Sequence, residues 1–112
     1  MRIDSGVLRD VPVLFVHGDV DHDSAPRLLR AAQEVLDSSC PRIIVDLSAC
    51  GYLDSGGIGA LLSVLRQVKH GIGWLGIVGA SGGVRRLLDI VALTSDPDVR
   101  SFEDLAAAEE QI

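Results

Sequence analysis

The chain has 112 residues, of which 47% are hydrophobic and 4% aromatic, and its formal net charge is -6. This length suits one domain with one core, and the hydrophobic content excludes disorder for most of the chain. The negative charge opposes phosphate backbones and anionic lipid, which argues against sequence-independent binding to nucleic acid or to a membrane surface. We therefore expect a single domain over residues 1–112 whose partner is a protein or a small molecule.

The N-terminal residues and the cysteines indicate the compartment. Asp4 and Gly6 stand where a signal peptide needs an apolar core, and no apolar run approaches the roughly 20 residues that span a bilayer. A disulfide between Cys40 and Cys50 is possible, but their spacing is not typical of a disulfide-rich scaffold. Free thiols in a reducing compartment are favoured, so we expect a cytoplasmic protein.

The first residues predict a β-hairpin. Strand patterns run from Met1 to Leu8 and from Val11 to His17, with a turn at Arg9 and Asp10. Pro12 cannot donate a backbone hydrogen bond, so it should lie at the beginning of the second strand or on an edge.

A helix is expected after the polar loop from Asp19 to Ser24. Pro26 suits its first turn, and Asp23 or Ser24 is the expected cap. We expect this helix to end between Asp37 and Ser39. Its expected buried stripe is Leu28, Leu29, Ala32, Val35 and Leu36.

The stretch from Ile43 to His70 carries the strongest pattern. An apolar run from Ile43 to Leu47 predicts a buried strand, and apolar residues at intervals of three and four then predict a helix that stops at Gly71. Asp54 or Ser55 is a natural N-cap, because a short side-chain oxygen can accept from the free amides of the first turn. Ser55 is thus a hydroxyl at a strand-to-helix turn, near the positive end of a helix. The apolar stripe of the helix is Ile58, Leu61, Leu62, Leu65 and Val68.

The C-terminal part continues the alternation of strand and helix. Its expected elements are a strand over Ile72 to Val78, a turn over Gly79 to Gly83, a helix from about Gly83 to Leu93, a strand over Val99 to Phe102 and a helix over Glu103 to Gln111. The expected buried face of the middle helix is Val84, Leu87, Leu88 and Val91. Such alternation indicates right-handed crossovers. The predicted fold is α/β, a mixed and mostly parallel sheet of about five strands with an N-terminal hairpin and about four helices packed on it.

Catalysis by Ser55 fits poorly. A nucleophile elbow needs glycine two residues before the serine, where Leu53 stands. His70 lies at the far end of the same predicted helix, roughly 22 Å away at 1.5 Å per residue. His22 could act as the base only if the fold brings it close to Ser55. A chain of this length also leaves little material for a substrate-binding cleft. We expect no enzymatic activity.

Two other patterns point weakly to ligands. The acids Asp19, Asp21 and Asp23 have the alternate spacing of a calcium loop, but Ser24 and Arg30 stand where that loop needs glycine and glutamate. The glycines from 76 to 83 could bare amides to a phosphate, yet they lack the lysine of a P-loop, and turn formation is the favoured interpretation. We therefore expect no metal and no cofactor. Binding of a nucleotide or small ligand at the glycine-rich turn, as in a sensor protein, is kept as a less favoured hypothesis.

A phosphate on Ser55 would act on binding more than on folding. As a plain cap the serine contributes about 1 kcal/mol to stability. A phosphate adds about -1.5 to -2 charges, which a helix N-terminus offsets by roughly 0.3 to 1 kcal/mol, while Asp54 and Asp21 repel it. A partner that covered this surface would bury an unpaired dianion, so its binding would suffer most.

Three segments carry a family resemblance. They are Gly18 to His22 ahead of a helix, Ile44 to Leu47 leading to Tyr52 to Gly59, and Val84 to Leu93. Together they resemble the STAS domain of bacterial anti-sigma factor antagonists from about Val11 to Phe102. The central motif of that family is Asp-Ser-Ser/Thr-Gly followed by an aliphatic residue and glycine.

The resemblance implies a partner switch. In this family the unmodified antagonist binds an anti-sigma factor with serine kinase activity and frees a sigma factor. Phosphorylation by that kinase, with ATP, ends the interaction, and a metal-dependent serine phosphatase restores it. By position Ser55 is the phosphoacceptor, Asp54 precedes it in the motif, and Asp21 is the loop acid beside it. The implied docking face includes Gly56, Gly57 and Gly59.

Two residues depart from the family pattern. Gly56 stands where the family usually has serine or threonine, and Ala92 replaces a frequent glycine. The loss of the second hydroxyl gives weight to an alternative, a STAS module that is a constitutive subunit of a multiprotein sensor or of a lipid-transport complex. In either case we expect a monomer or a weak dimer.

Overall fold

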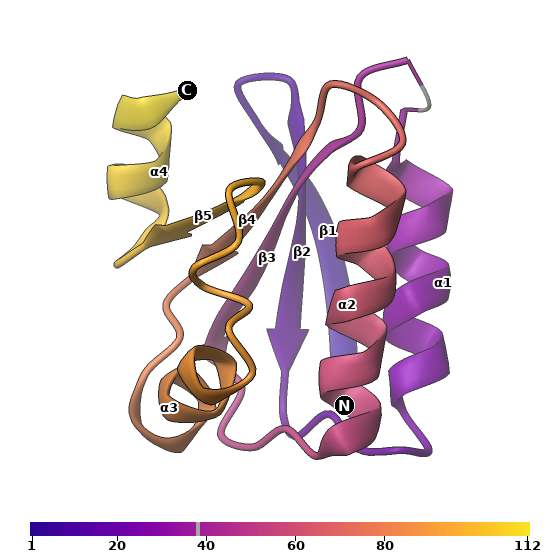
Figure 1. The fold of residues 1–112 in the computed structure, drawn as a ribbon, viewed down its shortest axis with the longest axis vertical. Coiled ribbons are helices and arrows are strands. Elements are labelled where there is room, and N and C mark those ends of the chain that lie inside the picture. The colour runs from indigo at the N-terminus through magenta and orange to yellow at the C-terminus, as the bar shows by residue number, and fades with distance from the viewer. Residues whose placement is uncertain (38) are drawn as a thin grey trace.

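A five-stranded sheet forms the centre of the computed structural model, which describes residues 1–37 and 39–112 (Figure 1). The strands are β1 (Arg2–Leu8), β2 (Val11–His17), β3 (Arg42–Ala49), β4 (Trp74–Val78) and β5 (Val99–Phe102). The helices in the described residues are α1 (Ala25–Val35), α2 (Ser55–Val68), α3 (Gly82–Ile90) and α4 (Leu105–Gln111). The strand order is β1-β2-β3-β4-β5, with β1 and β2 antiparallel and the later pairs parallel. The predicted fold class is confirmed.

The hairpin turn is a two-residue connection with left-handed backbone. Arg9 and Asp10 have φ values of 48° and 68°, and Leu8 pairs with Val11 across the turn. Positive φ at both central residues gives the twist that matches two right-twisted strands. Pro12 lies near the start of β2, as predicted.

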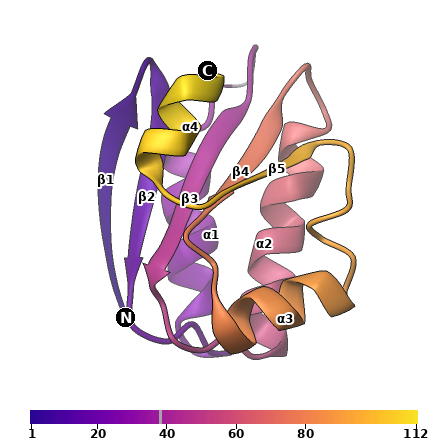
Figure 2. The same cartoon turned by 90° about the vertical axis from the view of Figure 1, so that its left-hand side faces the viewer.

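Helices cover both faces of the sheet. Figures 1 and 2 show α1 and α2 side by side on one face, with α4 over the other. Strand β3 alternates between the two sides, with Ile43 and Val45 in the larger core and Ile44 in the smaller one under α4. Burial on both sides explains why its sequence reads as a continuous apolar run. Fully buried members of the larger core include Leu14, Leu28, Ile43, Leu47, Leu61, Leu75, Ile77 and Leu88.

Some element boundaries differ from the prediction. Helix α1 ends at Val35, because Leu36 is already extended; Ser38, within the predicted end, lies outside the described residues. Strand β4 begins at Trp74 rather than at Ile72, which is 93% exposed. Helix α4 begins at Leu105, because the carboxylate of Asp104 accepts a hydrogen bond from the amide of Ala107 at 2.8 Å and caps it.

The two cysteines are free thiols. Cys40 precedes β3 and Cys50 follows it, so the eight residues of that strand separate them. At about 3.3 Å per residue the separation is several times the Cα distance of about 5.5 Å that a disulfide needs. A bridge between them is therefore ruled out in this fold. Within the described part of the chain, none of the helices has the length and apolar character needed to cross a bilayer.

Helix α3 ends earlier than predicted, at Ile90, in a left-handed turn. The amide of Ala92 donates to the carbonyl of Asp89, and the amide of Leu93 donates to that of Leu88, both at 3.0 Å. These two bonds make a Schellman motif, whose left-handed residue is usually glycine. Here Ala92 holds that position at φ 61°. An L-residue with a Cβ is strained in this conformation.

We predict that Ala92→Gly stabilises the protein. Relief of the left-handed strain should exceed the added chain entropy of glycine, which leaves a gain of about 0.5–1 kcal/mol in the free energy of unfolding. Urea denaturation monitored by circular dichroism measures it. Ala31→Gly, in the middle of α1, is the control and should lower stability. A loss of stability in both variants would show that the turn at position 92 is not left-handed.

Candidate functional site

Ser55 is the first residue of α2, at the carboxyl end of the parallel strands. The segment from β3 to α2 crosses the lower edge of the sheet, between α3 and the start of α2 (Figure 1). In sheets of this kind, functional residues gather where the strands end. The side chain of Ser55 is exposed, so an enzyme can reach its hydroxyl.

Asp54 joins the start of α2 to the loop before α1. Its Oδ1 accepts a hydrogen bond from the amide of Gly57 at 3.0 Å, and its Oδ2 accepts one from the amide of His22 at 2.9 Å. Of the two predicted N-caps, Asp54 is therefore the one that caps α2, and Ser55 is the first residue of the helix. The contact with His22 was not predicted from the sequence.

A short pairing of two loops supports this arrangement. Val20 and Leu53 form an isolated parallel bridge. The amide of Val20 donates to the carbonyl of Tyr52 at 3.0 Å, and the amide of Asp54 donates to the carbonyl of Val20 at 3.2 Å. Val20 and Leu53 are buried, which anchors both loops in the core. The loops that frame Ser55 are thus held to each other by backbone bonds.

The three glycines of the predicted docking face have different surroundings. A Cβ on Gly56 would lie 2.6 Å from the Cα of His22, so only glycine fits there without a shift of the loop. Gly57 is buried, and a Cβ on it would lie 2.8 Å from the carbonyl oxygen of Val20. Contrary to the prediction, Gly57 is therefore not part of an outward docking face, because it packs inward. Gly59 is exposed, and a Cβ on it would meet no atom within 4 Å.

Asp21 holds the start of α1. Its Oδ1 accepts from the amide of Ser24 at 2.8 Å, and its own amide donates to the hydroxyl of Ser24 at 2.9 Å. The bond that the Ser24 amide donates to the carboxylate, and after it hydrogen bonding by the Ser24 side chain, lower the pKa of Asp21. The N-cap residue is Ser24 rather than Asp23. The loop of Asp21 adjoins the start of α2, but the carboxylate that contacts α2 is that of Asp54.

The other sites considered from the sequence are a calcium-like loop, a glycine-rich turn and a histidine in reach of Ser55. Within residues 1–37 and 39–112, no group of three His, Cys, Asp or Glu side chains could hold a metal ion. The left-handed backbone of Gly79 and Gly82 accounts for two of the turn glycines. A Cβ on Gly79 would also lie 2.6 Å from that of Ser48, so close packing explains this glycine without a phosphate. His70 follows the C-terminal end of α2, far along the helix from Ser55.

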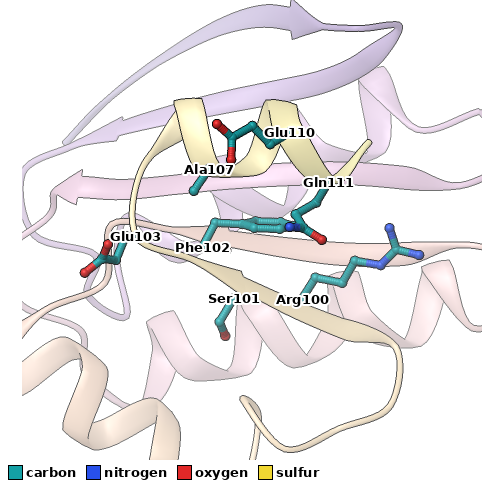
Figure 3. Close-up of a pocket in the computed structure, with 7 residues that line it drawn as sticks. All are labelled: Arg100, Ser101, Phe102, Glu103, Ala107, Glu110 and Gln111. Atoms are coloured by element: carbon teal, nitrogen blue, oxygen red, sulfur yellow. The ribbon is translucent and has the colours of Figure 1, made fainter.

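A hollow of about 470 Å³ lies between β5 and α4, away from Ser55 (Figure 3). The ring of Phe102 lies beneath α4, and Arg100 extends away from it over the face of Trp74, 4.4 Å from the ring centroid. The other lining residues are Ser101, Glu103, Ala107, Glu110 and Gln111.

A second hollow, of about 320 Å³, lies beside the Ser55 segment and was not predicted from the sequence. Its sides are Tyr52, on the loop before α2, and Leu87 and Ile90 on α3. Tyr52 is 54% exposed and Ile90 is 71% exposed. Val91, expected on the buried face of α3, is 39% exposed, because the helix ends before it. The available signal was that Ile90 falls outside the apolar stripe of α3.

Comparison with known proteins agrees with this geometry. A family model described as "Mlab, STAS domain" matches residues 6–106. The anti-sigma-B factor antagonist of Listeria monocytogenes serovar 1/2a is 24% identical over 90 residues, which cover 80% of this chain and 79% of that protein. An anti-sigma factor antagonist from Mycobacterium paratuberculosis, solved by crystallography, has a TM-score of 0.83 at 26% identity, over 99% of this chain and 92% of that one.

A further solved structure shares the fold. The Bacillus cell fate determinant SpoIIAA, in its phosphorylated form, gives a TM-score of 0.72 at 17% identity, over 99% of this chain and 100% of that chain. The family match includes all five strands in whole or in part, together with the two loops that Asp54 joins. The chain therefore belongs to the STAS domain family, among whose members are anti-sigma factor antagonists.

Proposed function

We propose that this chain is a non-enzymatic anti-sigma factor antagonist that phosphorylation of Ser55 switches off. Unphosphorylated, it binds an anti-sigma factor with serine kinase activity and so releases a sigma factor; a serine phosphatase reverses the modification. The observation that carries the proposal is an exposed Ser55 at the start of a helix whose cap is made by the neighbouring Asp54. The relatives named as anti-sigma factor antagonists support it.

The geometry separates the hydroxyl from the bonds that hold the site. Both carboxylate oxygens of Asp54 accept backbone amides, so a phosphate on Ser55 replaces none of these bonds. The phosphate and Asp54 repel each other, by about 4 kcal/mol for unit charges 4 Å apart at a dielectric of 20, and by less where water screens them. In the free protein water does screen them. In a complex the partner would displace that water, so the penalty falls on binding.

Small residues beside Ser55 suit a closely approaching partner. Gly56 is partly exposed and Gly59 is exposed, one helical turn apart on α2. At Gly59 no side chain separates the helix backbone from a partner, and such openness favours close packing of backbones. With Gly57 turned inward, the proposed docking face consists of Ser55, Gly56 and Gly59.

One observation favours a second function, a constitutive STAS subunit of a multiprotein sensor or of a lipid-transport complex. Gly56 removes the second hydroxyl of the family motif, and the matching family model carries the description "Mlab, STAS domain". In such a subunit, charge at Ser55 would not control a partner. The experiments below separate the two functions.

Phosphorylation should occur at Ser55 alone. We predict that incubation with ATP and each purified kinase-type anti-sigma factor of the source organism adds one phosphate in the cognate pair. Intact-mass spectrometry measures the gain, which should vanish in Ser55→Ala. Equal phosphorylation of Ser55→Ala would show that the acceptor lies elsewhere.

Charge at Ser55 should weaken partner binding without unfolding the domain. Ser55→Asp should raise the Kd for the cognate anti-sigma factor at least tenfold, because the added charge is desolvated in the complex. Ser55→Asn, of similar shape but neutral, is the matched control and should bind more nearly like wild type. Calorimetric titration gives the Kd, and urea denaturation should show a stability change below about 0.5 kcal/mol. A partner that binds wild type and Ser55→Asp equally well would support the constitutive subunit.

Alanine at the two outer glycines should have opposite effects on stability. Gly56→Ala places a Cβ against the backbone of His22 and should cost about 1–3 kcal/mol. Gly59→Ala enters open space in a helix and should stabilise by about 0.5–1 kcal/mol. If Gly59 belongs to the docking face, the same stabilised variant should bind the anti-sigma factor more weakly. Unchanged affinity in Gly59→Ala would remove this residue from the proposed face.

A further inference from the structure

An apolar hollow lies beside the proposed switch surface. Its floor includes Leu53 and Val84, which are buried, and its rim includes Tyr52 and Ile90, which are largely exposed. These rim residues account for two of the five large hydrophobic side chains that are exposed in the described part of the chain. Exposed apolar side chains around a hollow, as opposed to single scattered ones, are typical of a protein contact.

The hollow is continuous with the segment that carries Ser55. Gly51, Tyr52 and Leu53 line it, and Asp54 and Ser55 follow directly in the chain. The opposite side is α3, which lies at the same lower edge of the molecule as the start of α2 (Figure 1). A partner seated over Ser55 therefore reaches the hollow without a change in the fold.

The charges at the hollow indicate what fits it. Arg86 is the only charged residue among those that line it. In the described residues Arg86 has no ion-pair partner, whereas the neighbouring Arg85 pairs with Asp89 at 3.1 Å. On the loop side, Asp19 lies next to Gly51, 3.7 Å from a Cβ position there. The apolar rim thus has a free cation on the α3 side and a carboxylate on the loop side.

We infer that this hollow is a second docking point for the anti-sigma factor, an inference that rests on the proposed function. The occupant is a protein segment that inserts an apolar side chain between Tyr52 and Ile90 and places a carboxylate against Arg86. A buried apolar anchor carries much of the affinity of many interfaces, and a charge at the rim speeds association and fixes the orientation of the partner. The hollow supplies affinity for the partner, and phosphorylation of Ser55, at the edge of the same interface, weakens binding.

The test compares two exposed isoleucines. Ile90→Ser should raise the Kd for the cognate anti-sigma factor about tenfold or more in a calorimetric titration. Ile72→Ser is the matched control, because Ile72 is 93% exposed and lies in the loop after the C-terminal end of α2. Its Kd should equal that of wild type. Arg86→Glu should weaken binding and Arg30→Glu, on the outer face of α1, should not.

The outcomes separate this inference from the proposed function. If Ser55→Asp abolishes binding while Ile90→Ser binds like wild type, the docking point is wrong and the phosphoswitch stands. If wild type binds none of the anti-sigma factors, both fall. Equal weakening by Ile90→Ser and Ile72→Ser, or a wild-type dimer that Ile90→Ser converts to a monomer in sedimentation, also overturns the inference. Unchanged urea midpoints in all four variants show that folding is intact.

Discussion

The site depends on one carboxylate that accepts two backbone amides from segments far apart in the chain. Asp54 caps α2 through Gly57 and holds the loop before α1 through His22. A cap of this kind contributes about 1 kcal/mol, and an ionised acceptor makes its hydrogen bonds stronger than neutral ones. The bridge between Val20 and Leu53 places the two loops close enough for Asp54 to reach both. These structural bonds belong to Asp54 and not to the neighbouring Ser55, whose side chain is exposed.

Much of the fold could be predicted because its determinants are local. Apolar spacing located α2, the double-sided burial of β3 appeared as a continuous apolar run, and the turn at Arg9 and Asp10 followed from two adjoining strand patterns. The errors fall where a distant contact or an unusual backbone decides. Strand β4 starts only at Trp74, which pairs with Arg42 at the start of β3, a partner 32 residues away that the sequence of β4 does not reveal. Helix α3 ends early at a left-handed alanine, a conformation that the residue type disfavours and that no sequence pattern indicates.

The site was predictable to a similar extent. Cap chemistry identified Asp54 and Ser55, since both features depend on one helix start. The contact of Gly56 with His22 joins residues 34 apart in the sequence, so helix periodicity carried no information on it. The inward direction of Gly57 could have been found, because it precedes the buried Leu61 by one helical turn. For the hollow near Tyr52 the sequence offered one side only, Ile90 outside the apolar stripe of α3; that the loop of Tyr52 lies opposite depends on the tertiary fold.

Helix α2 is also tied down at its other end. Lys69, its C-cap, donates to Asp98 at 2.7 Å and to Asp96 at 2.9 Å, and these bonds raise the pKa of the lysine. Because water screens them, such pairs add little to the free energy of folding, and the buried apolar stripe of α2 is what positions the helix. With Asp54 capping its first turn and an apolar stripe in the core, α2 presents its outer surface in one orientation. Little conformational entropy is then lost when a partner binds that surface. On the proposed function, a phosphate at Ser55 would change the charge that a partner meets and not the shape of the helix, because Ser55 makes none of the bonds that hold α2.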